Sequence, residues 1–177
     1  MRRLAPIAVS LLVFGVAACG TADNSATPDG PAPAAGTTAA APAAPTTDYA
    51  AADALYRQMM PGLNLPSGVT FPEHLPDAGG QYQPNAGLVT AQNFWLCAWV
   101  FNYLGSGSAK TQAQAATAEL AKYSGMDAYT KALDNRGRQT VDDAVKAAQA
   151  GNKTIVQSFA QNSCGGPFYG KAKPAGS

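Results

Sequence analysis

Charge is scarce in this sequence. Only 13% of its 177 residues are Asp, Glu, Lys or Arg, and the two signs nearly balance, which gives a formal net charge of +1 at pH 7. A nucleic-acid-binding surface needs clustered lysine and arginine side chains. No such cluster is present, so we expect no binding to nucleic acid.

Catalytic motifs are also missing. The sequence has a single histidine, His74, and lacks the phosphate-binding Gly-x-x-x-x-Gly-Lys, the Gly-x-Ser-x-Gly elbow and the zinc-protease His-Glu-x-x-His. Asp142 and Asp143 are adjacent and would point about 100° apart on a helix, which suits a solvated first turn better than paired acid–base work. We therefore assign no catalytic residue and expect no cofactor.

The most apolar stretch is too short to cross a membrane as a helix. Residues 94–101 are eight apolar residues in a row and include both tryptophans. A helix over residues 91–104 would rise about 21 Å, short of the roughly 30 Å hydrocarbon core of a bilayer. Because this helix is apolar on every side, we predict that it is buried at the centre of the domain.

Residues 1–18 have the layout of a secretory signal peptide. Arg2 and Arg3 precede an apolar run, and Val16-Ala17-Ala18-Cys19 is followed by Gly20. These residues resemble the lipobox of bacterial lipoproteins, a resemblance that covers only about twenty residues of the sequence. It implies cleavage before Cys19, a diacylglycerol thioether on its sulfur, and attachment to the extracytoplasmic face of the cell membrane. Leu4-Ala5-Pro6 continues a twin-arginine motif poorly, so we favour the general secretory route.

Residues 19–47 are expected to form a disordered tether behind the lipidated cysteine. Alanine, proline, threonine and glycine dominate this segment, and almost no large apolar side chain is available to offset the entropy of ordering it. Threonine beside proline is also typical of O-glycosylated stalks. The folded domain is then residues 48–177.

Cysteine is rare, and two cysteines remain once Cys19 is assigned to lipidation. In an exported protein the oxidising compartment favours a disulfide between Cys97 and Cys164. Two buried free thiols acting as small apolar residues are the alternative.

The folded domain is predicted to be all-α, a single bundle of about five helices around the buried central helix with one disulfide. Apolar periodicity and stop signals place helices over residues 49–60, 91–104, 109–124, 140–151 and 152–164, with a shorter segment after Asp127. The expected caps are Thr47 or Asp48, Thr90, Ser108, Asp127, Thr140 with Asp143, and Asn152. In the last helix Ile155, Val156, Phe159 and Ala160 are expected to face inward.

Residues 62–89 form the least regular part of the domain. The segment contains four prolines, and so long a loop in a compact domain is either functional or an element misread. Glu73, His74 and Asp77 are candidate metal ligands or an acid–base group, or belong to a solvated loop. An envelope hydrolase that uses His74 and carboxylates such as Glu73 and Glu119 is the enzymatic alternative.

A binding function agrees better with this composition than an enzymatic function does. If the loop lies over Trp95 and Trp99, the gap beneath would be an apolar pocket, also lined by Tyr82 and Phe71, with Gln81, Gln83 and Asn85 at its rim. The loop could instead close the core. We predict a lipid-anchored, non-enzymatic cell-envelope protein that binds a small apolar ligand or an envelope partner.

Overall fold

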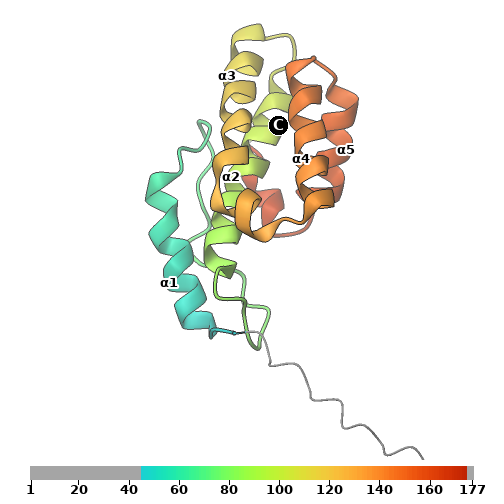
Figure 1. Ribbon diagram of the computed structural model, residues 1–177. Helices are drawn as coiled ribbons and strands as arrows, with labels where there is room; N and C mark the ends of the chain where they lie inside the picture. Colours follow the sequence, from blue (N-terminus) through green and yellow to red (C-terminus); the bar gives the residue numbers. More distant parts are fainter. Residues whose placement is uncertain (1–44, 175–177) are drawn as a thin grey trace, which may run out of the picture. The chain divides into compact units, whose positions relative to one another are not determined.

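The computed structural model describes residues 45–174, which form an all-α bundle (Figure 1). The predicted signal peptide, Cys19 and most of the predicted tether lie outside the described residues. No sheet forms between residues 45 and 174, where the single bridge joins Thr47 to Tyr82. The predicted fold class is confirmed. The α-helices of this described part are α1 (Tyr49–Met59), α2 (Ala86–Gly105), α3 (Lys110–Leu120), α4 (Asn135–Gln149) and α5 (Lys153–Ser163).

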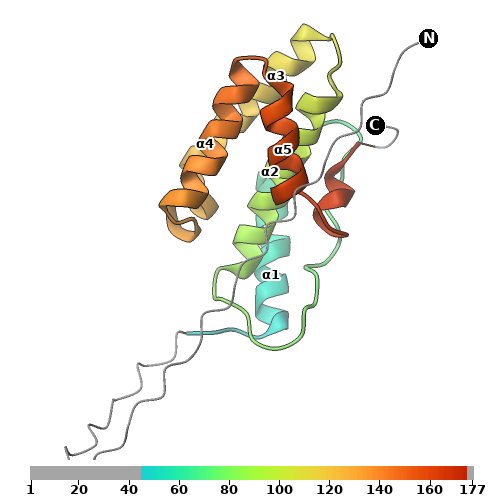
Figure 2. The same cartoon turned by 90° about the vertical axis from the view of Figure 1, so that its right-hand side faces the viewer.

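Helix α2 is the centre of the bundle, as its sequence predicted. Figures 1 and 2 show α1 lying along its first half, with α3 and α5 against its second half and α4 joining α3 to α5. Residues on every side of α2 are buried, among them Phe94, Trp95, Leu96, Ala98 and Val100. An unbroken apolar sequence is stable as a helix only when neighbours cover it on all sides.

Within residues 45–174, none of the helices combines the length and hydrophobicity required to cross a bilayer.

Helices α1 and α2 touch at a glycine. A Cβ atom built on Gly87 would lie 2.1 Å from the carbonyl oxygen of Ala52 and 2.6 Å from the backbone nitrogen of Tyr56. Only a residue without a side chain permits two backbones to come this close. Gly87 therefore sets the separation of α1 from α2.

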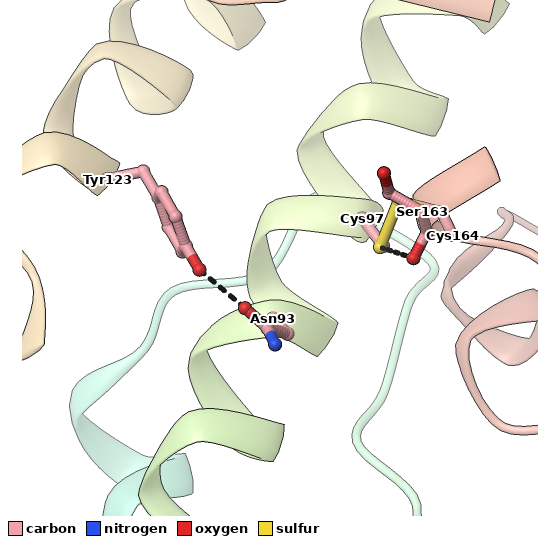
Figure 3. Close-up of a disulfide and its surroundings, with 5 residues drawn as sticks. All are labelled: Asn93, Cys97, Tyr123, Ser163 and Cys164. Atoms are coloured by element: carbon pink, nitrogen blue, oxygen red, sulfur yellow. Dashed lines mark hydrogen bonds between the residues drawn. A yellow bond between two sulfur atoms is a disulfide. The ribbon is translucent and has the colours of Figure 1, made fainter. Parts of the chain in front are cut away.

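The predicted disulfide is present. Cys97 of α2 is bonded to Cys164 at the end of α5, with 5.4 Å between the Cα atoms and a sequence separation of 67 (Figure 3). One turn before Cys97, the Asn93 side chain accepts a hydrogen bond from the Tyr123 phenol, which follows α3. The disulfide and this hydrogen bond fix the middle of α2 to two separate parts of the bundle.

Several predicted helix caps are wrong. Helix α2 begins at Ala86, so Thr90 lies inside it and does not cap it. The helix extends further toward the N-terminus than predicted, through Val89 and Leu88 to Gly87, which contacts α1. Helix α3 follows Ala109 with no side-chain cap, although Ser108 was expected there. In α4 the cap is Asp134, whose carboxylate accepts a hydrogen bond from the Gly137 nitrogen at 2.7 Å.

The remaining caps have mixed outcomes. Thr140 lies within α4 and donates to the Arg136 carbonyl instead of capping. Asp127 pairs with Lys131 rather than capping the single π-helical turn Ala128–Ala132. Asp48 and Asn152 do cap α1 and α5 as predicted.

One predicted core residue is exposed. Val156, Phe159 and Ala160 of α5 face inward, but Ile155 is 46% exposed. Adjacent helical positions point about 100° apart, so a helix that buries Val156 against α2 turns the preceding side chain outward.

Candidate functional site

An open groove of about 600 Å³ lies between the second half of α2, helix α5 and the C-terminal 3-10 turn Tyr169–Ala172, here called η4. Phe101 and Leu104 line it from α2, and Ala160 and Cys164 line it from α5 and its cap. Small-molecule sites in proteins usually have volumes of about 300–1,000 Å³ and mostly apolar walls. This groove, called the α2–α5 groove below, has the size and lining of such a site.

The third wall of the α2–α5 groove forms because the chain turns back after α5. Gly166 adopts a φ of 87°, a left-handed conformation that glycine takes without strain. The turn brings Phe168 against Phe94 and Tyr56, with ring centres 5.7 and 6.1 Å apart. These aromatic contacts hold η4 beside α2.

Two lysines give the α2–α5 groove a positive character. The Nζ atom of Lys153 donates to the Gly107 carbonyl at 2.8 Å and lies 5.8 Å from the centre of the Tyr103 ring. The Nζ atom of Lys173 lies 5.2 Å from the centre of the Phe101 ring. Of the acidic residues between positions 45 and 174, none lines this groove. The amides of Gln157 and Gln161 complete the polar part of its rim.

The tryptophans predicted to line a ligand site instead hold the loop directly. Trp95 is 2% exposed, and its indole nitrogen donates to the Asn64 carbonyl at 2.8 Å. The indole nitrogen of Trp99 donates to the same oxygen at 3.1 Å. Because one loop carbonyl accepts from both indoles, the loop touches the tryptophans rather than standing above them.

Phe71 and Tyr82 lie in other contacts. The Phe71 ring packs 5.1 Å from that of Phe94, in the core. The Tyr82 hydroxyl donates to Asp77 at 2.9 Å, and its ring lies 6.0 Å from Tyr49. None of the four residues predicted to bind a ligand lines the α2–α5 groove.

Helix α1 fixes the far side of the loop through polar side chains on one face. The Tyr49 hydroxyl donates to the Leu75 carbonyl and the Tyr56 hydroxyl to the Pro72 carbonyl, each at 3.0 Å. Asp53 accepts from the Leu75 nitrogen at 2.8 Å. Burial raises the pKa of Tyr56 above its ordinary value, so its hydroxyl remains a donor even in alkaline solution. The loop is thus tied to both α1 and α2.

Asp53 is the most heavily used carboxylate in the described part of the chain. Its residue is 5% exposed, and besides Leu75 it contacts Nδ1 of His74 at 3.0 Å and Nε of Arg57 at 3.1 Å. Burial alone would raise the pKa of Asp53. The hydrogen bonds from His74 and Leu75, with the charges of His74 and Arg57, outweigh burial and lower that pKa below its usual value.

Glu73, His74 and Asp77 do not converge. The Glu73 carboxylate lies 3.7 Å from Nε2 of His74, but Asp77 accepts from Tyr82 and from the Gly79 nitrogen. Between residues 45 and 174, no group of three His, Cys, Asp or Glu side chains is arranged to hold a metal ion. Glu119, a carboxylate of the enzymatic alternative, forms an i,i+3 ion pair with Lys122 at 2.6 Å.

Replacing Asp53 with asparagine is expected to lower the free energy of unfolding at pH 7 by about 1–3 kcal/mol, because the buried charged hydrogen bonds to His74 and Arg57 are lost. The lowered pKa means that the ionised carboxylate stabilises the fold above the unfolded-state value of about 3.9. That stabilisation is lost as the pH falls through the folded-state pKa. Urea unfolding at pH 3–7 should therefore show the difference between wild type and Asp53→Asn shrinking toward low pH. Asp143→Asn, at an exposed position of α4, is the control and should be as stable as wild type at every pH. If wild type and Asp53→Asn differed in stability by the same amount at every pH, the lowered pKa of Asp53 would be contradicted.

Neither Asp53 nor the α2–α5 groove was predicted from the sequence. Asp53 had a detectable signal, since it lies between Ala52 and Tyr56, which share one apolar face of the helix predicted over residues 49–60. The groove had none, because one wall comes from α2 and the others from α5 and η4, which α3 and α4 separate from α2 in the sequence.

The chain was compared with known protein families, curated proteins and solved structures, and none of them matches.

Proposed function

We propose that this protein is a lipid-anchored, non-enzymatic binding protein of the cell envelope, and that it takes a small apolar ligand into the α2–α5 groove. The observation that carries the proposal is the groove itself, with about 600 Å³ of volume above Phe101, Leu104 and Ala160. Concave sites with apolar walls and a few polar groups are where proteins bind small molecules.

The lipoprotein-like sequence around Cys19 supports the envelope location. Val16-Ala17-Ala18-Cys19 precedes a segment rich in alanine, proline and threonine, which would serve as a tether of roughly 30 Å or more. The Cys97–Cys164 disulfide also agrees with an oxidising compartment. A tethered domain with a groove would collect or hold its ligand close to the membrane surface.

One contact favours a second candidate, an envelope hydrolase. The Asp53 carboxylate contacts Nδ1 of His74, which would orient the imidazole and leave Nε2 to act as a general base. His74 is an exposed side chain that does not line the α2–α5 groove, so this pair has no substrate site described beside it. Hydrolysis of a peptidoglycan or lipid substrate that continues unchanged after His74→Ala would remove this candidate.

The test of the binding function uses the full chain carrying Cys19→Ala, which should leave the membrane fraction because it has no lipid attachment site. Calorimetric titration with dodecanol, a neutral single-chain ligand, is expected to show one binding site. Gln161→Trp should weaken that binding at least tenfold, about 1.4 kcal/mol, because an indole at the rim fills the groove.

Asn162→Trp is the matched control. Asn162 is also exposed on α5, next to Gln161, but does not line the groove. It should bind dodecanol as the parent does. Equal weakening by both variants, or the absence of any binding, would contradict the proposed site. Continued retention of Cys19→Ala by membranes would contradict the lipid anchor.

A further inference from the structure

We propose that the ligand of the α2–α5 groove is a long-chain carboxylate, bound with its alkyl chain along Leu104 and Ala160 and its carboxylate at Lys173, beside Phe101. This inference rests on the proposed function and specifies the chemical class of the ligand.

Charge complementarity is the first support. Both lysines line the groove, and no Asp or Glu of residues 45–174 lines it with them. The Lys173 ammonium lies over the Phe101 ring and pairs with no acidic side chain in that part of the chain. A carboxylate beside an apolar wall is costly unless a cation and hydrogen-bond donors compensate it. Lys173 provides both at the point where the apolar wall begins.

The Lys153 ammonium is already partly occupied by contacts within the protein. Its Nζ donates to the Gly107 carbonyl and lies 3.4 Å from the Ser106 hydroxyl, which holds the start of α5 against the end of α2. An ammonium group has three donors, so one contact with the backbone leaves others for a ligand. Lys153 therefore adds a second positive charge to the groove lining, held at the Gly107 carbonyl just after α2.

The apolar lining and the size of the groove favour one free alkyl chain over a membrane surface. Phe101, Leu104, Ala160 and Cys164 form a concave apolar wall rather than a flat patch. Proteins that lie on membranes present an extended amphipathic face, often with many lysines or arginines. A concave groove of about 600 Å³ suits a single chain with one head group.

The test compares dodecanoate with dodecanol on the full chain carrying Cys19→Ala, by calorimetric titration at pH 7 and low salt. These ligands have the same chain length and differ at the head group. Dodecanoate is expected to bind about tenfold more tightly than dodecanol, and high salt should reduce this preference because it screens exposed charges. This comparison requires no substitution in the groove.

Lys173→Gln should weaken dodecanoate binding about fivefold more than it weakens dodecanol binding, since it removes the charge but keeps most of the side chain. Lys171→Gln is the control, because Lys171 is exposed in the same turn but does not line the groove. It should bind both ligands as the parent does. Equal affinity for the two ligands, or equal losses in both lysine variants, would overturn the carboxylate assignment and leave the proposed binding function standing. Failure to bind either ligand would overturn both.

Discussion

Replacing Cys97 with serine is expected to lower the free energy of unfolding by about 4 kcal/mol, because the unfolded chain regains the freedom of a long loop. The disulfide joins residues separated by 67 positions and connects α2 to the end of α5. For a domain of this size the loss should lower the melting temperature by about 15 °C. Thermal and urea unfolding, followed by circular dichroism under oxidising conditions, would measure both quantities.

Cys164→Ser and the double variant are the controls for this prediction. Each single variant leaves one thiol and breaks the same bond, so the two should be destabilised alike, and the double variant by no more than either. Wild type treated with a reductant should match them. Additive losses in the double variant would mean that the cysteines stabilise the fold separately, which contradicts the disulfide.

Gly87→Ala is expected to destabilise the protein by at least about 3 kcal/mol, as overpacking of a close helix contact does. The new methyl carbon would lie 2.1 Å from a carbonyl oxygen of α1, and backbone atoms cannot move aside as a flexible side chain would. Helix α1 would have to withdraw from α2, together with the loop tied to it. Urea unfolding gives the stability, and a red shift of tryptophan fluorescence would report the loss of the loop from Trp95 and Trp99.

Gly105→Ala is the matched control for this substitution. Gly105 is the last residue of the same helix, and a Cβ atom there would meet nothing within 4 Å. Alanine favours the helix over glycine by up to about 1 kcal/mol, so the control should be neutral or slightly more stable. If Gly87→Ala were as stable as Gly105→Ala, the close approach of α1 to α2 would be wrong.

The parts of the fold that depend on local chemistry could be predicted from the sequence. The central position of α2 follows from the apolar run at residues 94–101, which cannot form a surface helix. Asp48 and Asn152 were identified as caps because each is a polar residue directly before an amphipathic segment. The disulfide followed from cysteine number and compartment.

The errors lie where distant parts of the chain decide the local structure. Thr90 and Thr140 are residue types that often cap helices, but α2 and α4 begin before them, at Ala86 and Asn135. In α2 the added N-terminal turn packs against α1 at Gly87. The loop was recognised as unusual, yet its partners on α1 could not be identified. Asp53 shows why: the backbone nitrogen of Leu75 that it binds lies 22 residues away.

The candidate site was the least predictable part of the protein. The aromatic residues chosen from the sequence, Trp95, Trp99, Tyr82 and Phe71, lie in the contacts that fix the loop and the core. The groove instead depends on how far α5 stands from α2 and on the turn at Gly166, which brings η4 back to the bundle. Such distances between segments are properties of the packed domain and are not encoded in any short stretch of sequence.

The measurement that tests the central claim most directly is a ¹H–¹⁵N correlation spectrum of the full chain carrying Cys19→Ala, titrated with dodecanoate. A ligand in the α2–α5 groove should shift the amide signals of residues that line it, such as Gly105, Gln161 and Gly170. The signals of Asn64, Phe71 and the Trp95 indole should stay in place. Shifts confined to the loop and the tryptophans would contradict the groove and return the site to the position that the sequence alone suggested.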